Sequence, residues 1–388
     1  MRRTYEEINE KIKKGDAVVM TAEEVIGVVE RDGIDEATKE VDVVTTGTFG
    51  AMCSSGAFLN FGHSEPPIKM TKVWLNDVPA YSGLAAVDAY IGATEPREDG
   101  NIDYGGANVI EDLIAGKPVR LRATAFGTDC YPRREIDTFI SLATLNQAYM
   151  YNPRNSYQNY GVATNSSERT LFTYMGKLLP KYGNATYSSA GQLSPLLNDP
   201  HLRTIGIGTR IFLGGGQGYV AWEGTQYRTT ATERNGVPTG ASRSLAVVGD
   251  LRGMSTEFVR ALDFQKYGPS LGVGIGVPIP ILDEDMMKCV SVRDDQIFAP
   301  ILDYAVQSRN RKPMKEVSYA ELRSGSVELA GKRVRTSSLS SYFKAKQIAE
   351  TLKRQMLKGE FLLTRPVAML PAERAQMPLD LHSREEVA

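Results

Sequence analysis

The amino-acid sequence predicts an α/β protein in which mixed β-sheets are layered with helices. Helix and strand patterns alternate at the start of the chain, and residues 41–44 form an apolar, β-branched run typical of a buried strand. Glycine-rich apolar stretches recur at 204–220 and 271–280, where strands with bends are expected. This alternation argues against an all-α or an all-β chain.

Helices and short strands precede the buried run. Tyr5–Lys14 is an amphipathic pattern that ends at Gly15, and residues 17–20 form a short apolar strand. The sequence TAEE at 21–24 is a capping box, which opens a second helix through Val29. The N-terminal part should therefore form a layer of helices on a strand.

Strand and helix patterns also occur together in the later part of the chain. Strands are predicted at 70–75, Val119–Thr124, 244–248 and 271–280, and helices at 108–115, 283–288 and 171–179. A helix is also expected at 132–143, because Ile136, Phe139, Ile140 and Ala143 repeat at helical spacing.

The last strong element is a C-terminal basic amphipathic helix at Tyr342–Leu357, with Phe343, Ile348, Leu352 and Met356 on one face. Its basic remainder is a solvated face or a docking surface for an acidic partner. Residues 1–365 are expected to form one catalytic domain, and 366–388 a loosely ordered tail.

Composition excludes several classes of protein. The chain has 388 residues, 42% of them hydrophobic and 23% charged, and a formal net charge of −1, so nothing points to nucleic acid or to an anionic membrane. No apolar run reaches the ~20 residues that span a bilayer. Three cysteines are too few for a disulfide framework. With a charged start that lacks a signal-peptide core, the sequence predicts a reduced, cytoplasmic protein.

Cys53 follows the buried run in a turn rich in glycine and small polar residues. Such a turn presents one side chain and several backbone N–H groups to a ligand, and nearby positive partial charge favours the nucleophilic thiolate. The alternative is a buried structural cysteine. The residues expected to form this anion-binding loop are Gly47, Gly50, Ser54 and Ser55.

Cys130 lies in a similar Gly-Thr turn, GTDCYPRRE. Arg133 and Arg134 add positive charge within a turn of it, which again favours the thiolate. Two such turns indicate nucleophiles rather than packing. Cys289 lies in no such turn and is interpreted as structural.

Other candidates would bind substrate. The polar run 151–161 has no apolar period and is an exposed or a substrate-binding loop, in which Arg154 is a plausible carboxylate ligand beside Asn155 and Gln158. His63 is either a proton donor or acceptor or an ordinary loop histidine. A second glycine-rich turn, suited to an anion or simply to strand bends, contains Gly214, Gly215 and Gly216.

The sequence contains neither the dinucleotide fingerprint G-x-G-x-x-G nor the P-loop. Five long stretches instead point to a known family: VDVVTTGTFGAMCSSGA, YIGAT, GTDCYPRRE, NPRNSYQNY and GIGTRIFLGGGQGYV. They resemble the homocysteine biosynthesis family, from Ile8 to about Leu363. The resemblance implies L-aspartate semialdehyde sulfurtransferase activity, functional cysteines at Cys53 and Cys130, and a separate or fused ferredoxin-type iron–sulfur partner.

The implied reaction turns an aldehyde and sulfide into a thiol, with loss of water and uptake of two electrons and two protons. We expect one thiol, provisionally Cys53, to carry a persulfide or to attack the substrate, and Cys130 to supply reducing equivalents by closing a disulfide that the partner reopens. No cofactor is predicted within the chain. The carboxylate would bind Arg133, Arg134 or Arg154, and protons would move through His63 or Asp129.

Three alternatives stay open. The first is an iron–sulfur cluster ligated by Cys53 and Cys130, with or without Cys289. The second is a CoA-transferase-like fold and enzyme, suggested by the opening helix-Gly-Asp-strand pattern and the glycine-rich turns, which would need a carboxylate nucleophile. The third is a non-catalytic sulfur-relay protein. A homo-oligomer is expected, with the site within one subunit or across two.

Overall fold

A computed structural model describes residues 3–377 and 379 of the chain. It is a mixed α/β structure with several sheets, as the sequence predicts. Within the described residues no helix is long and apolar enough to cross a membrane. The helices there are α1 (Tyr5–Lys14), α2 (Ala22–Glu40), α3 (Gly106–Ile114), α4 (Pro195–Asn198), α5 (Glu284–Val290), α6 (Tyr319–Arg323) and α7 (Tyr342–Leu357).

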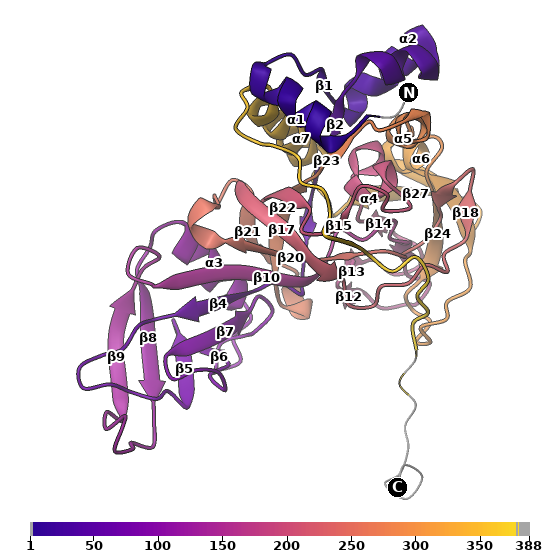
Figure 1. Ribbon diagram of the computed structural model, residues 1–388. Coiled ribbons are helices and arrows are strands. Elements are labelled where there is room, and N and C mark those ends of the chain that lie inside the picture. Colours follow the sequence, from indigo (N-terminus) through magenta and orange to yellow (C-terminus); the bar gives the residue numbers. More distant parts are fainter. Residues whose placement is uncertain (1–2, 378, 380–388) are drawn as a thin grey trace, which may run out of the picture.

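A small sheet and three helices, α1, α2 and α7, form one end of the molecule (Figure 1). Strand β1 (Val19–Thr21) pairs in parallel with β2 (Val43–Thr45), and α2 is the crossover between them. β2 pairs antiparallel with β23 (Pro278–Pro280). The predicted capping box at Thr21 is present, but α2 continues past Val29 to Glu40, with a non-helical residue at Gly33 (φ +82°).

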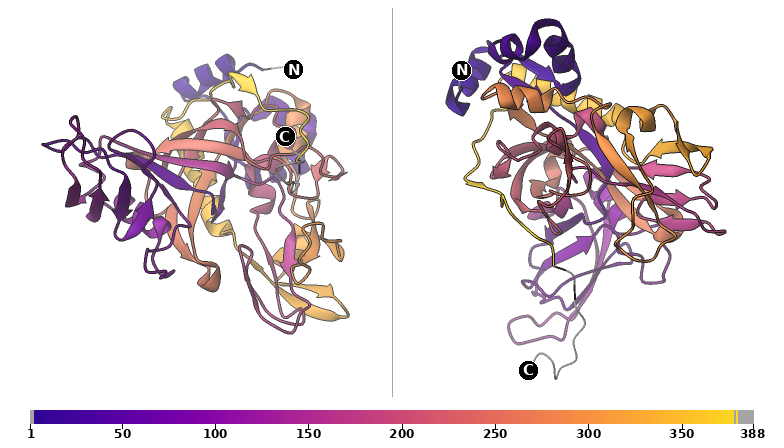
Figure 2. Two further views of the ribbon diagram at one scale, coloured as in Figure 1. Left: turned by 90° about the horizontal axis from the view of Figure 1, so that it is seen from below. Right: turned by 90° about the vertical axis from the view of Figure 1, so that its right-hand side faces the viewer.

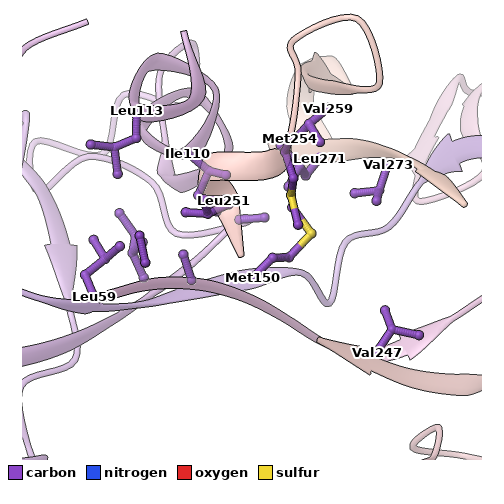
Figure 3. Packing of buried hydrophobic residues seen from close by; sticks show 14 of the residues in the cluster. Leu59, Ile110, Leu113, Met150, Val247, Leu251, Met254, Val259, Leu271 and Val273 are labelled. Carbon is purple, nitrogen blue, oxygen red and sulfur yellow. The ribbon is translucent and has the colours of Figure 1, made fainter. Parts of the chain in front are cut away.

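The largest sheet is antiparallel throughout and carries the main hydrophobic core (Figure 3). Helix α3 covers it, so that Ile110 and Leu113 are buried together with Leu59 and Met150 of the sheet. Its path is β21 (Val259–Asp263), β22 (Pro269–Gly276), β16 (Arg210–Leu213), β17 (Gly216–Glu223), β20 (Leu245–Asp250), β10 (Gln147–Asn155), β4 (Gly56–Asn60) and β7 (Asp88–Gly92), with β3 (Thr48–Ala51) also paired to β22.

Helix α7 packs closely on β22 because that strand carries glycine where the helix crosses it. A Cβ atom at Gly274 would lie 2.7 Å from Ile348 Cδ1, closer than such contacts occur. The predicted apolar face of α7 is right for Ile348, Leu352 and Met356, which are buried. It is wrong for Phe343, which is 73% exposed. At about 100° per residue, Phe343 lies roughly 140° around the helix from Ile348.

A second, six-stranded sheet has its own core. It is mixed, since β11 pairs in parallel with β24 and β14 with β27. Its order is β25 (Lys315–Ser318), β24 (Phe298–Asp303), β11 (Val162–Thr164), β14 (Ala185–Tyr187), β27 (Lys332–Ser338) and β26 (Ser326–Leu329). Two small hairpins are β12 (Leu171–Thr173) with β13 (Gly176–Leu178), and β18 (Glu233–Arg234) with β19 (Val237–Pro238).

A four-stranded antiparallel sheet extends from the body as a separate lobe (Figures 1 and 2). Its order is β6 (Val78–Ala80), β5 (Lys72–Leu75), β8 (Val119–Thr124) and β9 (Glu135–Ile140). The predicted helix at 132–143 is therefore wrong, because this segment pairs with β8 in the register Thr124 to Glu135. The predicted helix at 171–179 is also wrong, since Gly176 (φ +81°) lies in the β12–β13 hairpin.

The predicted tail begins at residue 366, and part of it is a strand. β28 (Ala368–Met369) pairs with β15 (Gly206–Ile207), and Tyr227 donates a hydrogen bond to the carbonyl of Pro371. Residues 378 and 380–388 lie outside the described residues.

Candidate functional site

A cavity of about 400 Å³ lies between the nine-stranded and the six-stranded sheets. One wall is the turn from β3 to β4, which carries Cys53, together with the end of β10. The facing wall comes from segments that follow β14 and β24. The lining is rich in hydroxyl, phenol and guanidinium groups, with Cys53, Ser54, Arg154, Tyr157, Tyr267 and Arg309 among them.

Cys53 is half-buried and meets a serine from a neighbouring strand. The Oγ atom of Ser270, fully buried in β22, donates a hydrogen bond to the Cys53 Sγ atom at 3.2 Å. The predicted nucleophile turn is thus a wall of the pocket, with its sulfur held by a specific donor.

A buried amide joins the cysteine turn to β10. Asn152 accepts hydrogen bonds from Ser54 Oγ at 2.8 Å and from the Arg154 backbone N–H at 2.9 Å, and donates one to Ser55 Oγ at 2.9 Å. The register of β10 against β20 shifts between Asn152 and Asn155, and such a bulge re-aims the side chains beside it. The side chain of Arg154 lines the pocket at this bulge. The run 151–161 is therefore a strand in its first half, not a loop.

Tyrosines form a contiguous group beside Cys53. Burial raises the pKa of Tyr267, the negative charge of Cys53 raises it further, and Arg154 opposes the shift. Burial likewise raises the pKa of Tyr160, which packs edge-on against Tyr174 at 6.0 Å between ring centroids. These phenols remain protonated at neutral pH, so they can donate hydrogen bonds to a ligand.

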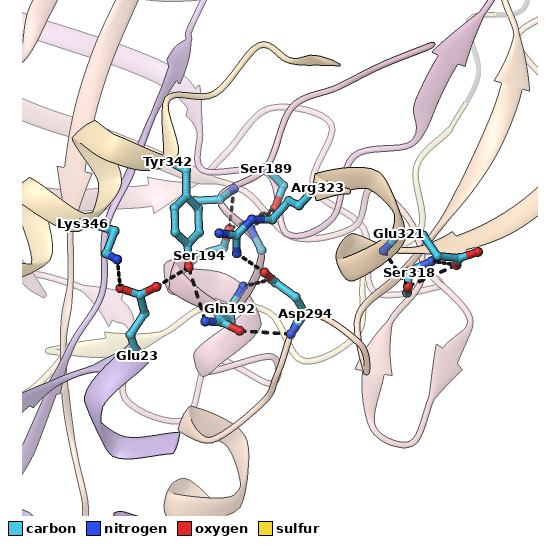
Figure 4. Close-up of polar contacts among 12 residues, drawn as sticks. Glu23, Ser189, Gln192, Ser194, Asp294, Ser318, Glu321, Arg323, Tyr342 and Lys346 are labelled. Carbon is cyan, nitrogen blue, oxygen red and sulfur yellow. Dashed lines mark hydrogen bonds and ion pairs between the residues drawn. The ribbon is translucent and has the colours of Figure 1, made fainter. Parts of the chain in front are cut away.

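The back of the pocket is held by a polar network (Figure 4). Gln192 and Asp294 exchange two backbone-to-side-chain hydrogen bonds, and Arg323 forms an ion pair with Asp294. Tyr342 of α7 accepts from Gln192 and donates to Glu23 of α2. The segment between β14 and α4 carries Ser189 and Ser194, which line the pocket. Their Oγ atoms form a hydrogen bond of 3.0 Å with each other.

Cys130 lies elsewhere, on the exposed turn between β8 and β9. Arg133 donates to the carbonyls of Glu65 and Pro66, and His63 stacks on Tyr131 at 5.8 Å between ring centroids. Cys130, Arg133, His63 and Tyr131 are here termed the hairpin site. The hairpin site adjoins the C-terminal end of β4, whereas Cys53 precedes the N-terminal end of that strand. The five residues of β4 alone span about 13 Å. The structure does not bring Cys130, Arg133, Arg134 or His63 into the pocket.

Other predicted binding residues have structural partners. Gln158 is buried and donates to the carbonyls of Leu196 and Pro200. Asn155 is also buried, and its Oδ1 accepts from Ser156 Oγ, whereas its Nδ2 has no hydrogen-bond partner among the described residues. The Gly47 backbone N–H donates to Leu193, so it is not available to an anion, although Gly50 does line the pocket. The predicted second glycine turn lies outside the pocket: the hairpin between β16 and β17 holds Gly214, Gly215 and Gly216 against 253–258, so an anion site there stays a prediction.

Among the residues that sequence reasoning missed are Tyr267, Arg309 and Arg311, which line the pocket, and Ser270, which bonds the Cys53 sulfur. The two arginines belong to the run SRNRK at 308–312, whose charge was the available signal. Tyr267 and Ser270 flank the start of β22, and only strand pairing places them beside Cys53.

The three cysteines lie in three different places. Cys289 is on α5, where burial raises the pKa of its thiol to about 11 and keeps it protonated. Among the described residues, no group of three or more His, Cys, Asp or Glu side chains could hold a metal ion. A cluster held by all three cysteines of one chain therefore finds no support in this geometry.

The basic side chains of α7 are largely paired within the chain. Lys346 contacts Glu23 at 2.7 Å, Lys353 contacts Glu24 at 2.6 Å, and Lys344 contacts Glu257 at 3.4 Å. This face therefore stabilises helix packing, which leaves less free charge for an acidic partner.

Comparison with known proteins shows the family. A family model described as "homocysteine biosynthesis enzyme, sulfur-incorporation" matches residues 17–363. The chain belongs to this family. It is 55% identical over 373 residues to the L-aspartate semialdehyde sulfurtransferase of Methanosarcina acetivorans, covering 96% of this chain and 73% of that protein. It is 54% identical over 383 residues to the protein of the same name from Methanocaldococcus jannaschii, covering 95% and 73%.

A more distant relative is an uncharacterized protein of Methanothermobacter thermautotrophicus, 32% identical over 337 residues, with 84% of this chain and 73% of that protein covered. No solved structure matches the chain. The expected likeness to CoA-transferases thus has no structural support, while the family itself is that of enzymes of sulfur incorporation.

Proposed function

We propose that this chain is an L-aspartate semialdehyde sulfurtransferase, which uses sulfide and two electrons to make L-homocysteine. The observation that carries the proposal is the pocket around Cys53, in a chain more than half identical to two enzymes of that name. In atoms, the aldehyde and hydrogen sulfide give a thiohemiacetal, loss of water gives a thioaldehyde, and two electrons with two protons give the thiol.

Each pocket group has a proposed role in that sequence. Cys53, with Ser270 as hydrogen-bond donor, is the nucleophile that attacks the aldehyde carbon, or it carries a persulfide formed when hydrosulfide opens the Cys53–Cys130 disulfide and the Cys130 thiolate leaves. Arg154 binds the substrate carboxylate, because its planar guanidinium matches two carboxylate oxygens. The protonated phenols of Tyr157 and Tyr160 are donors to the oxygen that leaves as water.

Cys130 needs a different arrangement from the one expected. A disulfide requires Cα atoms within roughly 7 Å, and β4 separates Cys53 from the hairpin site. We therefore propose a homo-oligomer in which the exposed hairpin of a second copy brings its Cys130 to the Cys53 pocket. A ferredoxin-type protein that reduces the resulting disulfide, and a cytoplasmic location, remain part of the proposal.

The test is anaerobic turnover of aspartate semialdehyde and sulfide with a strong reductant, with homocysteine measured by mass spectrometry. Wild type should form homocysteine, Cys53→Ser should form none, and Cys289→Ala, whose thiol is outside the pocket, should resemble wild type. No product from any of them, even with a ferredoxin-type protein added, would count against the activity. A persulfide on Cys53 without product would favour the sulfur-relay alternative.

The CoA-transferase alternative predicts the opposite result for the variant. It needs a carboxylate nucleophile, and among the described residues no Asp or Glu lines the pocket. Full activity of Cys53→Ser in a CoA-transfer assay would be required to revive it.

A further inference from the structure

The pocket carries more positive charge than the proposed substrate balances. Arg154, Arg309 and Arg311 line it, and in the part of the chain that the structure describes no acidic side chain does. Aspartate semialdehyde has one carboxylate and one ammonium group at neutral pH, so its net charge is zero. Its carboxylate can occupy one guanidinium and leaves two without an anion.

The pocket is also larger than a four-carbon amino acid requires. Its volume of about 400 Å³ lies within the range of roughly 300–1,000 Å³ in which proteins bind drug-sized ligands. The proposed substrate is far smaller than such ligands, so a second group fits beside it.

The surplus arginines are on the wall that faces Cys53. Both follow β24 of the six-stranded sheet, whereas Arg154 lies in the β10 bulge of the other sheet. Arg311 is oriented by a hydrogen bond from its Nε atom to the Val306 carbonyl at 3.0 Å and by packing over Tyr304 at 4.3 Å. Among the described residues its terminal N–H groups form no hydrogen bond or ion pair, so they remain for a ligand.

Tyr157 lies between the two walls. Burial raises the pKa of its phenol, while the positive charges of Arg154, Arg309 and Arg228 oppose that shift. Arg154 also packs over the ring at 5.9 Å. The tyrosine thus stands at the boundary between an amino-acid side and an arginine side of one cavity.

We propose that Arg309 and Arg311 form a second subsite, which binds a tetrahedral dianion while the amino acid occupies Arg154 and Cys53. Each guanidinium can donate two parallel hydrogen bonds to a pair of oxygens of such an anion, whereas hydrosulfide has a single acceptor atom and cannot form that bidentate contact. The position of this subsite rests on the proposed function, since Arg154 is assigned to the substrate there.

The dianion has two chemical sources, a phosphoryl group and thiosulfate. Only thiosulfate can react with the thiolate: Cys53 attacks the outer sulfur, the sulfur–sulfur bond breaks, and sulfite leaves with the bonding electron pair. The product is a Cys53 persulfide, with no external oxidant or reductant. A phosphoryl group would only bind.

Calorimetric titration of the Cys53→Ser protein tests binding without turnover. Inorganic phosphate and thiosulfate are titrated at constant ionic strength set with sodium chloride, with and without L-homoserine, an unreactive four-carbon zwitterion. We expect each dianion to bind together with homoserine. Arg309→Gln and Arg311→Gln should each weaken dianion binding by about tenfold or more and leave homoserine binding within about twofold.

The controls separate this subsite from its neighbour. Arg154→Gln should weaken homoserine rather than the dianion, and Arg335→Gln, an exposed arginine of β27 outside the pocket, should change neither. Absent dianion binding, unchanged affinity in both arginine variants, or competition with homoserine would overturn the proposal. Homocysteine formation by wild type would stand in each of those cases, so the two proposals fail separately.

The same experiment identifies the source. Wild-type protein incubated with thiosulfate should gain the mass of one sulfur atom on Cys53 if thiosulfate is the ligand. Binding of both dianions without that gain assigns the subsite to a phosphoryl group.

Discussion

The pocket and the hairpin site contain the two cysteines that the sequence pairs, and they are built in opposite ways. Cys53 is half-buried, and its sulfur and its turn are tied to β22 and β10 by hydrogen bonds. Cys130 is exposed on a lobe, and the arginine beside it is used to hold a neighbouring loop. The difference indicates that one thiol is preorganised for a ligand, whereas the other is accessible to another protein surface.

The largest expected effect is on homocysteine formation, which should need both the Cys53 and the Cys130 thiol. Cys53→Ser and Cys130→Ser should each lose homocysteine formation, because each removes one thiol of the proposed pair. A co-assembled mixture of the two should recover activity, since an intact pocket of one copy can meet the intact hairpin of another. If the mixture stays inactive while each variant assembles as wild type does, the shared-site arrangement is wrong.

Rates of cysteine alkylation compare the pocket and the hairpin site directly. At pH 8 a thiol with a pKa near 11 is about one part in a thousand thiolate, so Cys289 should react slowest with iodoacetamide, and faster as pH rises towards 11. L-homoserine with phosphate should protect Cys53 and leave Cys130 unprotected, because only the former lines the pocket. Peptide mass spectrometry reads all three sites, and equal protection of both would contradict the separation of the two sites.

A smaller effect is expected at the donor to sulfur. Ser270→Ala removes the hydroxyl that donates to the Cys53 sulfur and holds it in place, and a typical hydrogen bond contributes about 0.5–1.5 kcal/mol. The rate of Cys53 alkylation at pH 7 should therefore change by roughly tenfold or less, because the sulfur loses the partner that fixes its position. Ser244→Ala is the matched control, as Ser244 Oγ is buried without a partner. An alkylation rate equal to that of wild type would remove Ser270 from this role.

The smallest effect is on stability. Asn152→Ala leaves the buried hydroxyl of Ser55 without its donor and should lower the free energy of unfolding by about 1–3 kcal/mol. Urea unfolding measures this loss. Asn310→Ala, at an exposed position, should change stability by less than about 0.5 kcal/mol. A variant at Asn152 as stable as wild type would show that the network does not hold the cysteine turn.

Local sequence patterns predict correctly those elements in which the buried residues recur at the spacing of the element itself. The capped helix at Thr21 and the stripe Ile348, Leu352 and Met356 are of this kind. The segment 132–143 has a helical period too, yet it is a strand, because β8 offers a complete ladder of hydrogen bonds. Pairing with a distant partner is not visible in a local window.

The site divides in the same way. Cys53 and Arg154 were predicted, since each lies in a polar run next to an apolar strand. The nearness of Arg133 and Arg134 to Cys130 in the sequence predicts a substrate-binding role for both, but the Arg133 guanidinium binds backbone carbonyls. Arg309 and Arg311 reach the pocket only through the pairing of β24 with β11, which no local pattern encodes.

The position of the pocket between two separate hydrophobic cores also bears on how the protein melts. A molecule bound there touches both halves, so its binding free energy is added to the contact between them. We expect the ligand-free protein to unfold in two calorimetric transitions, and the protein saturated with homoserine and phosphate to merge them into one at higher temperature. Small ligands would then set the cooperativity of the whole chain.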